Sequence, residues 1–238
     1  MDDLPVLTPL NNPTAARPLL GMTVLVVEDS LYACDAVRLM CLHSGARIRR
    51  ADRLRSARRH LAVYRPTVMI IDLGLPDGSG LDLVRELAAS ESRVTSIIAT
   101  SGCDEAESSA IAAGADAFLA KPLVNLGVFQ QTVLATLPRD RQPNGPRKLR
   151  DDVIHPDPLA YRDDMMHVSN LLDAQEGGQV LDYVAQFLGG VARSADDGQL
   201  ALAADALADA RCNGAGLESP VARIANLLQE RLARQVAI

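Results

Sequence analysis

Short apolar runs alternate with amphipathic stretches from residue 22 to residue 137. The runs at residues 23–29, 66–72 and 94–101 are rich in β-branched residues, which is typical of strands buried on both faces. Together with the short runs at residues 46–51 and 115–120, they predict five strands. The stretches between them have helical spacing and predict five helices, at residues 31–44, 52–64, 81–90, 104–113 and 124–136. This alternation predicts an α/β fold with a doubly wound, five-stranded parallel sheet.

Local signals add detail within this region. Asp52 stands where the second helix should begin and is its expected N-cap. Residues 73–80 are rich in Gly, Pro and Asp and predict a loop. Cys34 and Cys41 are seven residues apart in the first helix, so they should share its buried face.

Three further segments flank this region, which we assign to residues 21–137. Residues 1–20 contain four prolines and predict a flexible leader, and residues 138–158 contain five prolines and predict a linker. Residues 159–238 lack a clear strand. Their amphipathic runs predict an all-α bundle of about four helices, at residues 161–173, 177–194, 197–212 and 219–236.

Composition narrows the classes of function. Aromatic residues make up 3% of the chain and Trp is absent, which argues against a stacking platform for single-stranded nucleic acid. The net charge is −6, and residues 159–238 carry −5 of it, from 6 basic and 11 acidic residues. This balance predicts that nucleic acid is not a partner. The sequence has no run of 18 apolar residues, so we expect no membrane span.

Cysteine usage bears on the compartment. Four cysteines occur, at positions 34, 41, 103 and 212, without a CxxC pair, so the sequence gives no support for a structural zinc site. Sparse, unpaired cysteines are typical of proteins in the reducing cytosol, which predicts a cytoplasmic location. Cys212 is expected to be a buried core residue and not a nucleophile.

Polar side chains lie at the ends of four of the predicted strands. They are Glu28, Asp29, Asp72, Thr100, Ser101 and Lys121. The carboxyl ends of parallel strands meet at one rim of the sheet, so these side chains should lie together. Mg²⁺ would neutralise the repulsion among the carboxylates. Asp72 could then act as a nucleophile toward a phosphoryl donor, with the lysine and the threonine hydroxyl stabilising the added charge.

A purely structural interpretation exists for each of these residues. Glu28 and Asp29 could end a strand and cap the next helix, Asp72 could cap a turn, and Lys121 could be a solvated surface charge. That interpretation requires a suitable polar residue to occur by coincidence at each of four strand ends. A single functional site formed by all of these residues is therefore favoured.

The motifs VLVVEDS, MIIDLGLPDGSGLDLVREL, IIATSG and GADAFLAKPL resemble the receiver domain of two-component response regulators. The resemblance runs from about Met22 to Leu137 and implies a flavodoxin-like fold. It also implies that Asp72 accepts a phosphoryl group from a phosphohistidine of a sensor histidine kinase or a histidine phosphotransfer protein. By the same resemblance, Glu28, Asp29, Asp72 and the carbonyl of Gly74 hold Mg²⁺.

The family resemblance assigns further roles around the phosphoacceptor. Thr100 and Lys121 would contact the phosphoryl group, and Lys121 would precede a cis proline at position 122. Thr100 and Phe118 match the switch pair of the family, in which the hydroxyl moves toward the phosphoryl group and the aromatic ring turns inward. Plain core packing is the alternative for Phe118.

The C-terminal region carries a fainter resemblance. The stretch LADARCNGAGLESPVARIANLLQERL, at residues 207–232, is similar to histidine phosphotransfer (Hpt) domains. In this alignment the phosphorylatable histidine position falls on Ala210, the lysine position falls on Asn213, and Gly214 keeps the glycine. Since both reactive groups are missing, the resemblance implies a pseudo-Hpt module that binds a partner.

Taken together, the sequence predicts a cytoplasmic phosphorelay protein that is not an enzyme in the usual sense. Its output would be a changed contact with a downstream protein target through the helical domain, and the formation of a homodimer is left open. One alternative is an active phosphotransfer or phosphatase module that uses His155 or His167. A second alternative is a DNA-binding transcriptional regulator. Seven arginines could form a docking patch or, as we favour, a solvated helical face; they are Arg49, Arg50, Arg53, Arg55, Arg58, Arg59 and Arg65.

Overall fold

Five parallel strands form one sheet in the order β2-β1-β3-β6-β7. The computed structural model describes residues 12–103, 105–145, 152–174 and 178–234. The strands are β1 (Thr23–Val27), β2 (Arg47–Ala51), β3 (Val68–Asp72), β6 (Ser96–Ser101) and β7 (Ala117–Ala120). All residues of the inner strands β3 and β6 are buried, which explains why the middle of each strand is apolar. The predicted α/β fold is therefore confirmed.

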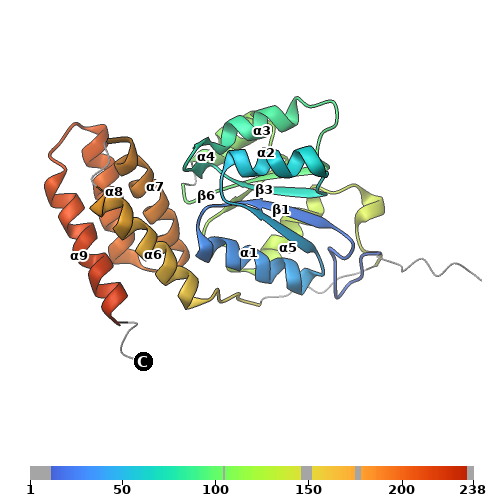
Figure 1. The fold of residues 1–238 in the computed structure, drawn as a ribbon. Helices are drawn as coiled ribbons and strands as arrows, with labels where there is room; N and C mark the ends of the chain where they lie inside the picture. Colours follow the sequence, from blue (N-terminus) through green and yellow to red (C-terminus); the bar gives the residue numbers. More distant parts are fainter. Residues whose placement is uncertain (1–11, 104, 146–151, 175–177, 235–238) are drawn as a thin grey trace, which may run out of the picture.

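Helices cover both faces of the sheet (Figure 1). One face packs against α1 (Leu31–Ser44) and α5 (Leu126–Ala135), and the other packs against α2 (Leu54–Val63), α3 (Gly80–Ala88) and α4 (Ala106–Ala112). Successive residues of β1 alternate between the two cores: Val24 and Val26 face α1 and α5, whereas Leu25 and Val27 face the opposite layer. The sheet is thus a rigid central layer whose strand ends can hold a site.

The predicted N-cap of the second helix is wrong. Arg53 holds the cap position and makes no side-chain cap bond. The free amides of Leu54 and Arg55 instead donate to the carboxylate of Asp77, at 2.8 and 3.0 Å. Asp52 accepts a hydrogen bond from the hydroxyl of Ser56, at 2.7 Å. The capping carboxylate comes from a loop more than twenty residues away, so a local pattern could not identify it.

The predicted loop at 73–80 contains a small antiparallel hairpin. Its strands are β4 (Gly74–Leu75) and β5 (Gly78–Ser79). At Gly80 the chain passes so close to the end of β3 that an added Cβ would lie 2.0 Å from the carbonyl oxygen of Asp72. A glycine at this position therefore lets the hairpin fold back beside Asp72.

The structure differs from the predicted leader and linker at their inner ends. Leu19 is fully buried in the core, and its amide donates to the carbonyl of Ser44 at 2.9 Å. Ile154 is also buried, and its amide donates to the carbonyl of Val124 at 2.8 Å. These apolar side chains fill the edge of the core, so both segments are anchored there. A short 3-10 turn, η1 (Arg139–Arg141), follows α5, and residues 1–11 and 146–151 lie outside the described residues.

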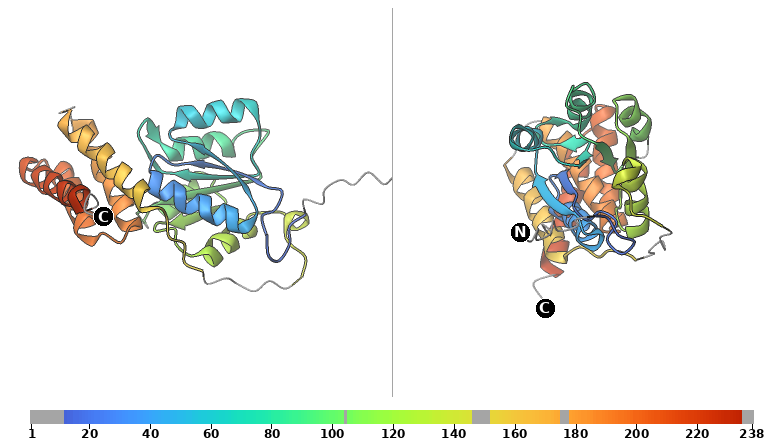
Figure 2. Two further views of the ribbon diagram at one scale, coloured as in Figure 1. Left: turned by 60° about the horizontal axis from the view of Figure 1, so that its bottom comes forward. Right: turned by 90° about the vertical axis from the view of Figure 1, so that its right-hand side faces the viewer.

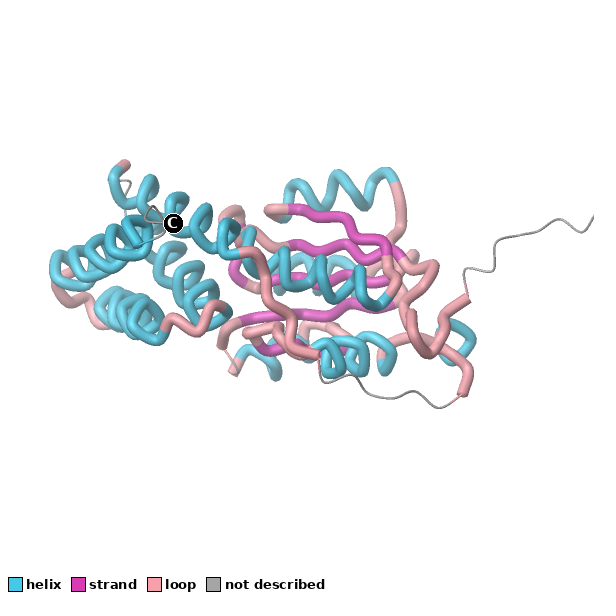
Figure 3. The backbone as a smooth tube through the Cα atoms, turned by 90° about the horizontal axis from the view of Figure 1, so that it is seen from below, coloured by secondary structure: helices cyan, strands magenta, loops and turns pink. Residues whose placement is uncertain are grey.

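Four helices form a second body after the linker. They are α6 (Pro158–Asp173), α7 (Gly178–Ser194), α8 (Gly198–Cys212) and α9 (Glu218–Arg234). Figures 2 and 3 show that this bundle lies beside one end of the sheet. Its aliphatic core includes Met165, Val184, Leu188, Leu207 and Ile224. Each helix matches a predicted amphipathic run to within about three residues at its ends. Among the described residues, every helix is too short or too polar to span a bilayer.

The cysteine predictions have different outcomes. Cys34 and Cys41 are buried on α1, as their spacing predicts. Cys212 is exposed, so the prediction that it packs in the interior is wrong. Leu207 and Ala210 lie on the core face of α8, and a residue two positions after Ala210 is turned about 200° around the helix, away from the core.

Candidate functional site

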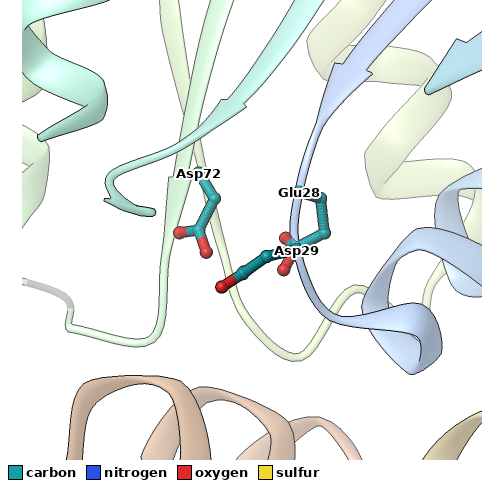
Figure 4. Close-up of side chains that lie close together, drawn as sticks. All are labelled: Glu28, Asp29 and Asp72. Atoms are coloured by element: carbon teal, nitrogen blue, oxygen red, sulfur yellow. The ribbon is translucent and has the colours of Figure 1, made fainter. Parts of the chain in front are cut away.

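Three carboxylates converge at the carboxyl end of the sheet (Figure 4). Glu28 and Asp29 directly follow β1, and Asp72 ends the neighbouring strand β3. One carboxylate oxygen from each residue lies within 4.8 Å of the others. Glu28 and Asp72 are buried and Asp29 is half-buried. The predicted convergence of these side chains at one rim is present in the structure.

Lys121 places an ammonium group inside this acidic cluster. It follows β7, where its amide donates to the carbonyl of Ser101 at 2.9 Å. Its Nζ lies 2.8 Å from Glu28 Oε2 and 3.0 Å from Asp72 Oδ2. The Lys121–Pro122 peptide bond is cis, as the family resemblance implies. The lysine therefore neutralises part of the charge that the carboxylates bring together.

The hydroxyl of Thr100 is buried without a hydrogen-bond partner among the described residues. Thr100 lies on β6, directly opposite Asp72 in the register of the two strands. An unsatisfied buried hydroxyl costs about 1–3 kcal/mol, so a ligand oxygen at this rim would relieve that cost. Phe118 lies on the adjacent strand β7, pairs with Ala99, and is half-buried at the edge of the core.

Burial sets the electrostatics of the cluster. It raises the pKa of Glu28 to about 8, although the ammonium of Lys121 opposes this shift. Burial, together with the nearby carboxylate of Asp72, raises the pKa of Asp29 to about 7. Burial alone would lower the pKa of Lys121, but the charges of Asp72 and Glu28 raise it overall. Clustered oxygen donors of this kind suit a hard divalent cation, which fits the residues expected to hold Mg²⁺.

Backbone groups complete the surroundings of the three carboxylates. The amide of Gly74 lies 3.4 Å from Asp72 Oδ1 and donates to it. Arg50 donates from its guanidinium to the carbonyl oxygens of Asp29, at 2.9 Å, and Glu28, at 3.4 Å. Arg50 therefore holds the β1–α1 connection, a role that was hidden by its place in a run of arginines.

Residues 24–132 match the model of the response regulator receiver domain. This segment is a response regulator receiver domain. The match agrees with the resemblance of the motifs around Asp72 and Lys121. The match ends in α5, so it does not bear on the helical domain formed by α6 to α9.

Several known proteins are similar to the receiver domain. The KDP operon transcriptional regulatory protein KdpE of Escherichia coli is 32% identical over 127 residues, which is 53% of this chain and 56% of that protein. The virulence transcriptional regulatory protein PhoP of Salmonella typhimurium is 33% identical over 104 residues, 42% of this chain and 46% of that protein. The chain therefore spans about half the length of the curated relatives it matches.

A solved structure is also similar. It is the receiver domain of the sensor histidine kinase PA1611 from Pseudomonas aeruginosa, with a magnesium ion coordinated in its active-site cleft. This domain is 26% identical, covers 48% of this chain and 96% of its own, and aligns with a TM-score of 0.44.

The helical domain contacts the receiver at the acidic cluster. The hydroxyl of Tyr183, on α7, donates to Asp29 Oδ2 at 2.7 Å. The buried carboxylate of Asp164, on α6, accepts from the hydroxyl of Ser30 at 2.7 Å and from the amides of Leu31 and Tyr32 at 2.8 and 3.1 Å. Asp164 therefore caps the first turn of α1 from another domain, where the helix dipole favours a negative charge.

Helix α7 also closes the space above the phosphoacceptor candidate. A cavity of about 20 Å³ remains between the two domains. The receiver lines it with the acidic residues, Gly74, Ser101 and Lys121, among others, and α7 contributes Gln186, Phe187, Gly190 and Val191. None of the four α7 residues carries a group that could transfer a phosphoryl group to Asp72.

The other predicted positions of the helical domain lie elsewhere. Ala210 is buried on the core face of α8, Asn213 is the C-cap of that helix, and Gly214 follows with a φ of 63°. These positions, aligned with the reactive region of Hpt domains, do not line the cavity above Asp72. His155 is exposed in the segment before α6, whereas His167 Nε2 lies 3.5 Å from the hydroxyl of Tyr183.

Proposed function

We propose that this chain is a phosphorelay signalling protein whose receiver accepts a phosphoryl group on Asp72. The observation that carries the proposal is the convergence of three carboxylates and the ammonium of Lys121 at one buried rim. The donor would be a phosphohistidine of a sensor histidine kinase or a histidine phosphotransfer protein. An oxygen of Asp72 attacks phosphorus, the P–O bond forms, and the P–N bond to the imidazole breaks.

Each residue of the rim has a separate part in this step. When bound, Mg²⁺ would neutralise the charge that gathers between the donor and the acceptor. Glu28, Asp29, Asp72 and the carbonyl of Gly74 would hold it. The ammonium of Lys121 offsets the charge of the transferred group, and the free hydroxyl of Thr100 donates to one of its oxygens. Thr100 would move with that bond, and the half-buried ring of Phe118 would turn inward.

The output of this switch would be a protein contact, not a chemical product. The helical domain touches the rim directly, so it is the element that a change at Asp72 reaches first. We therefore propose a cytoplasmic protein that is not an enzyme, with the helical domain as a pseudo-Hpt partner-binding module. The absence of a reactive group at Ala210 and Asn213 supports this assignment.

The test of the receiver function is chemical labelling of the full chain. With Mg²⁺ and radiolabelled acetyl phosphate, the wild-type protein should form an acyl phosphate, and Asp72→Ala should abolish it. Asp82→Ala is the matched control, because Asp82 is exposed on α3 and pairs with Arg85 of the same helix. Persistent labelling of Asp72→Ala would show that the acceptor lies elsewhere.

The second candidate is an active phosphotransfer module in the helical domain. Of the two candidate relay residues, His167 is better placed than His155. His167 lies against Tyr183, which itself contacts the rim. A chase of label from Asp72 to an acid-labile site, lost in His167→Ala, would support this candidate.

A role with nucleic acid is the third candidate. KdpE and PhoP are named as transcriptional regulatory proteins. Their names run against the prediction that this chain does not bind nucleic acid. The charge of −5 on residues 159–238 supports that prediction. Salt-dependent retention of the full chain on DNA would overturn it.

A further inference from the structure

Two features of the docked arrangement conflict with a phosphorylated receiver. The first is volume: the cavity above Asp72 measures about 20 Å³, which is room for roughly one water molecule. A phosphoryl group adds a phosphorus and three oxygens, and a hydrated metal ion needs further space beside it. Neither group fits above Asp72 while α7 holds its present position.

The second feature is that side chains of α7 already contact the acidic residues and the backbone beside them. Tyr183 already donates to Asp29 Oδ2, the side of the carboxylate that faces the helical domain. Gln186 lies so close to Gly74 that a Cβ added to the glycine would be 2.2 Å from its Nε2. The backbones also approach closely, since a Cβ added to Gly102 would lie 3.4 Å from the Cα of Gly190. Helix α7 therefore packs tightly against the receiver at Gly74 and Gly102.

The receiver face that α7 covers is also the face that a phosphodonor must reach. The donor atom has to approach Asp72 from outside the strand ends, which is where Phe187, Gly190 and Val191 now lie. Asp164 occupies the start of α1 beside it. The structure thus shows that this face of the receiver fits a pair of helices, α6 and α7 of the same chain.

We propose that the helical domain is a competitor in cis for the phosphoacceptor face. Docking of α6 and α7, on one side, and binding of Mg²⁺ and a phosphodonor, on the other, exclude each other. A helical phosphohistidine protein must displace α7 to reach Asp72, and the phosphorylated receiver in turn holds the helical domain away. By linkage, docking lowers phosphorylation by the same equilibrium factor by which phosphorylation lowers docking. This inference rests on the proposed function, because it requires Asp72 to be the acceptor.

Two native cysteines allow a direct test on the full chain. Cys103, in the receiver, and Cys212, at the end of α8, are exposed and line one groove of about 820 Å³ between the two domains. The other two cysteines, Cys34 and Cys41, are buried. A short bis-maleimide should therefore join Cys103 to Cys212 within one chain and lock the docked state. A monofunctional maleimide on the same cysteines is the matched control.

With acetyl phosphate and Mg²⁺, the locked chain should be labelled at about one-tenth of the rate of the monofunctional control, or more slowly still. Beryllofluoride with Mg²⁺, added before the bis-maleimide, should lower the yield of the cross-link. Equal labelling of locked and control chains, or a cross-link yield that beryllofluoride leaves unchanged, would overturn the proposal.

Single substitutions give an independent measure. Tyr183→Phe removes the bond to Asp29 and should raise the initial labelling rate about three- to tenfold, because hydrogen bonds to charged groups are among the stronger ones. Tyr64→Phe is its control, since the Tyr64 hydroxyl is a buried group of the receiver at the end of α2. Asp164→Asn should act in the same direction, with the neighbouring exposed Asp163→Asn as control.

The two levels of the hypothesis fail in different ways. If no form of the chain is labelled, including Tyr183→Phe, then the assignment of Asp72 as acceptor is wrong. If wild type is labelled but Tyr183→Phe and Asp164→Asn match their controls, Asp72 keeps its role and the competition in cis is wrong.

Discussion

Replacing Lys121 with methionine tests whether the rim is held together by charge. Nζ lies 2.8 and 3.0 Å from the carboxylates of Glu28 and Asp72, and all three side chains are at most 10% exposed. At an effective dielectric constant of about 20, each contact contributes roughly 5–6 kcal/mol of attraction, much of which is offset by desolvation of the ammonium. Deleting one partner of such a buried pair costs about 3–5 kcal/mol. We therefore expect Lys121→Met to lower the free energy of unfolding by about 3 kcal/mol at pH 8 without Mg²⁺.

The loss should depend on pH with a defined sign. Burial already raises the pKa of Glu28 to about 8, and removing Lys121 takes away the charge that opposes this shift. A carboxyl group with a raised pKa in the folded state is stabilising below its unfolded pKa and becomes destabilising as the pH rises toward its folded value. The deficit of Lys121→Met should therefore be smaller at pH 5 than at pH 8. Mg²⁺ should recover part of it at pH 8, because the ion binds only the folded chain.

Urea unfolding followed by circular dichroism, at pH 5 and pH 8 and with or without Mg²⁺, measures each of these quantities. Arg93→Met is the matched control. It breaks a 2.8 Å ion pair with Asp116 in the same domain, but both side chains are about one-third exposed, so the expected cost is below about 1 kcal/mol. A Lys121→Met chain within about 1 kcal/mol of wild type at pH 8 would refute the electrostatic account of the rim.

Two further predictions concern single contacts. Asp77→Ala should destabilise the chain by about 1 kcal/mol in urea unfolding, because it uncaps α2, whereas Asp52→Ala should cost less; the reverse order would restore Asp52 as the cap. Hydrogen bonds from Arg231 lower the pKa of Asp197, so the stability from this carboxylate is present above its unfolded pKa and is lost as the pH falls through its folded pKa. Thermal unfolding should show that the deficit of Asp197→Asn shrinks between pH 5 and pH 3, and a constant deficit would contradict this.

The sheet and its rim were predictable from the sequence for one physical reason. A strand buried on both faces is apolar along its middle, so β3 and β6 stand out as short apolar runs that end in polar residues at the rim. Parallel strands all end at the same rim, so residues 28, 72, 100 and 121 could be placed together without knowledge of any contact. The geometry of Lys121 between Glu28 and Asp72 follows from that arrangement.

Contacts between distant segments were not predictable in this way. Asp77 caps a helix that begins more than twenty residues before it, and Asp164 caps one that begins more than 130 residues before it. In the sequence, Asp164 is one acidic residue beside another in an amphipathic helix, with nothing to mark it as buried. Tyr183 likewise fits the helical pattern of α7 equally well whether it faces solvent or Asp29. Only the docking of the two domains gives these side chains their roles.

The composition of α7 explains how an acidic domain can rest on an acidic site. The helical region carries a charge of −5, yet the α7 residues above the carboxylates are Tyr183, Gln186, Phe187, Gly190 and Val191, all neutral. The nearby acidic group, Asp164, is directed away to the amides at the start of α1, where it is favoured. Docking therefore adds no charge to the cluster and rests on a few polar contacts and close packing. A phosphoryl group on Asp72 would add negative charge to an acidic cluster and volume to a nearly filled cavity. Phosphorylation therefore opposes docking through both electrostatic repulsion and steric exclusion.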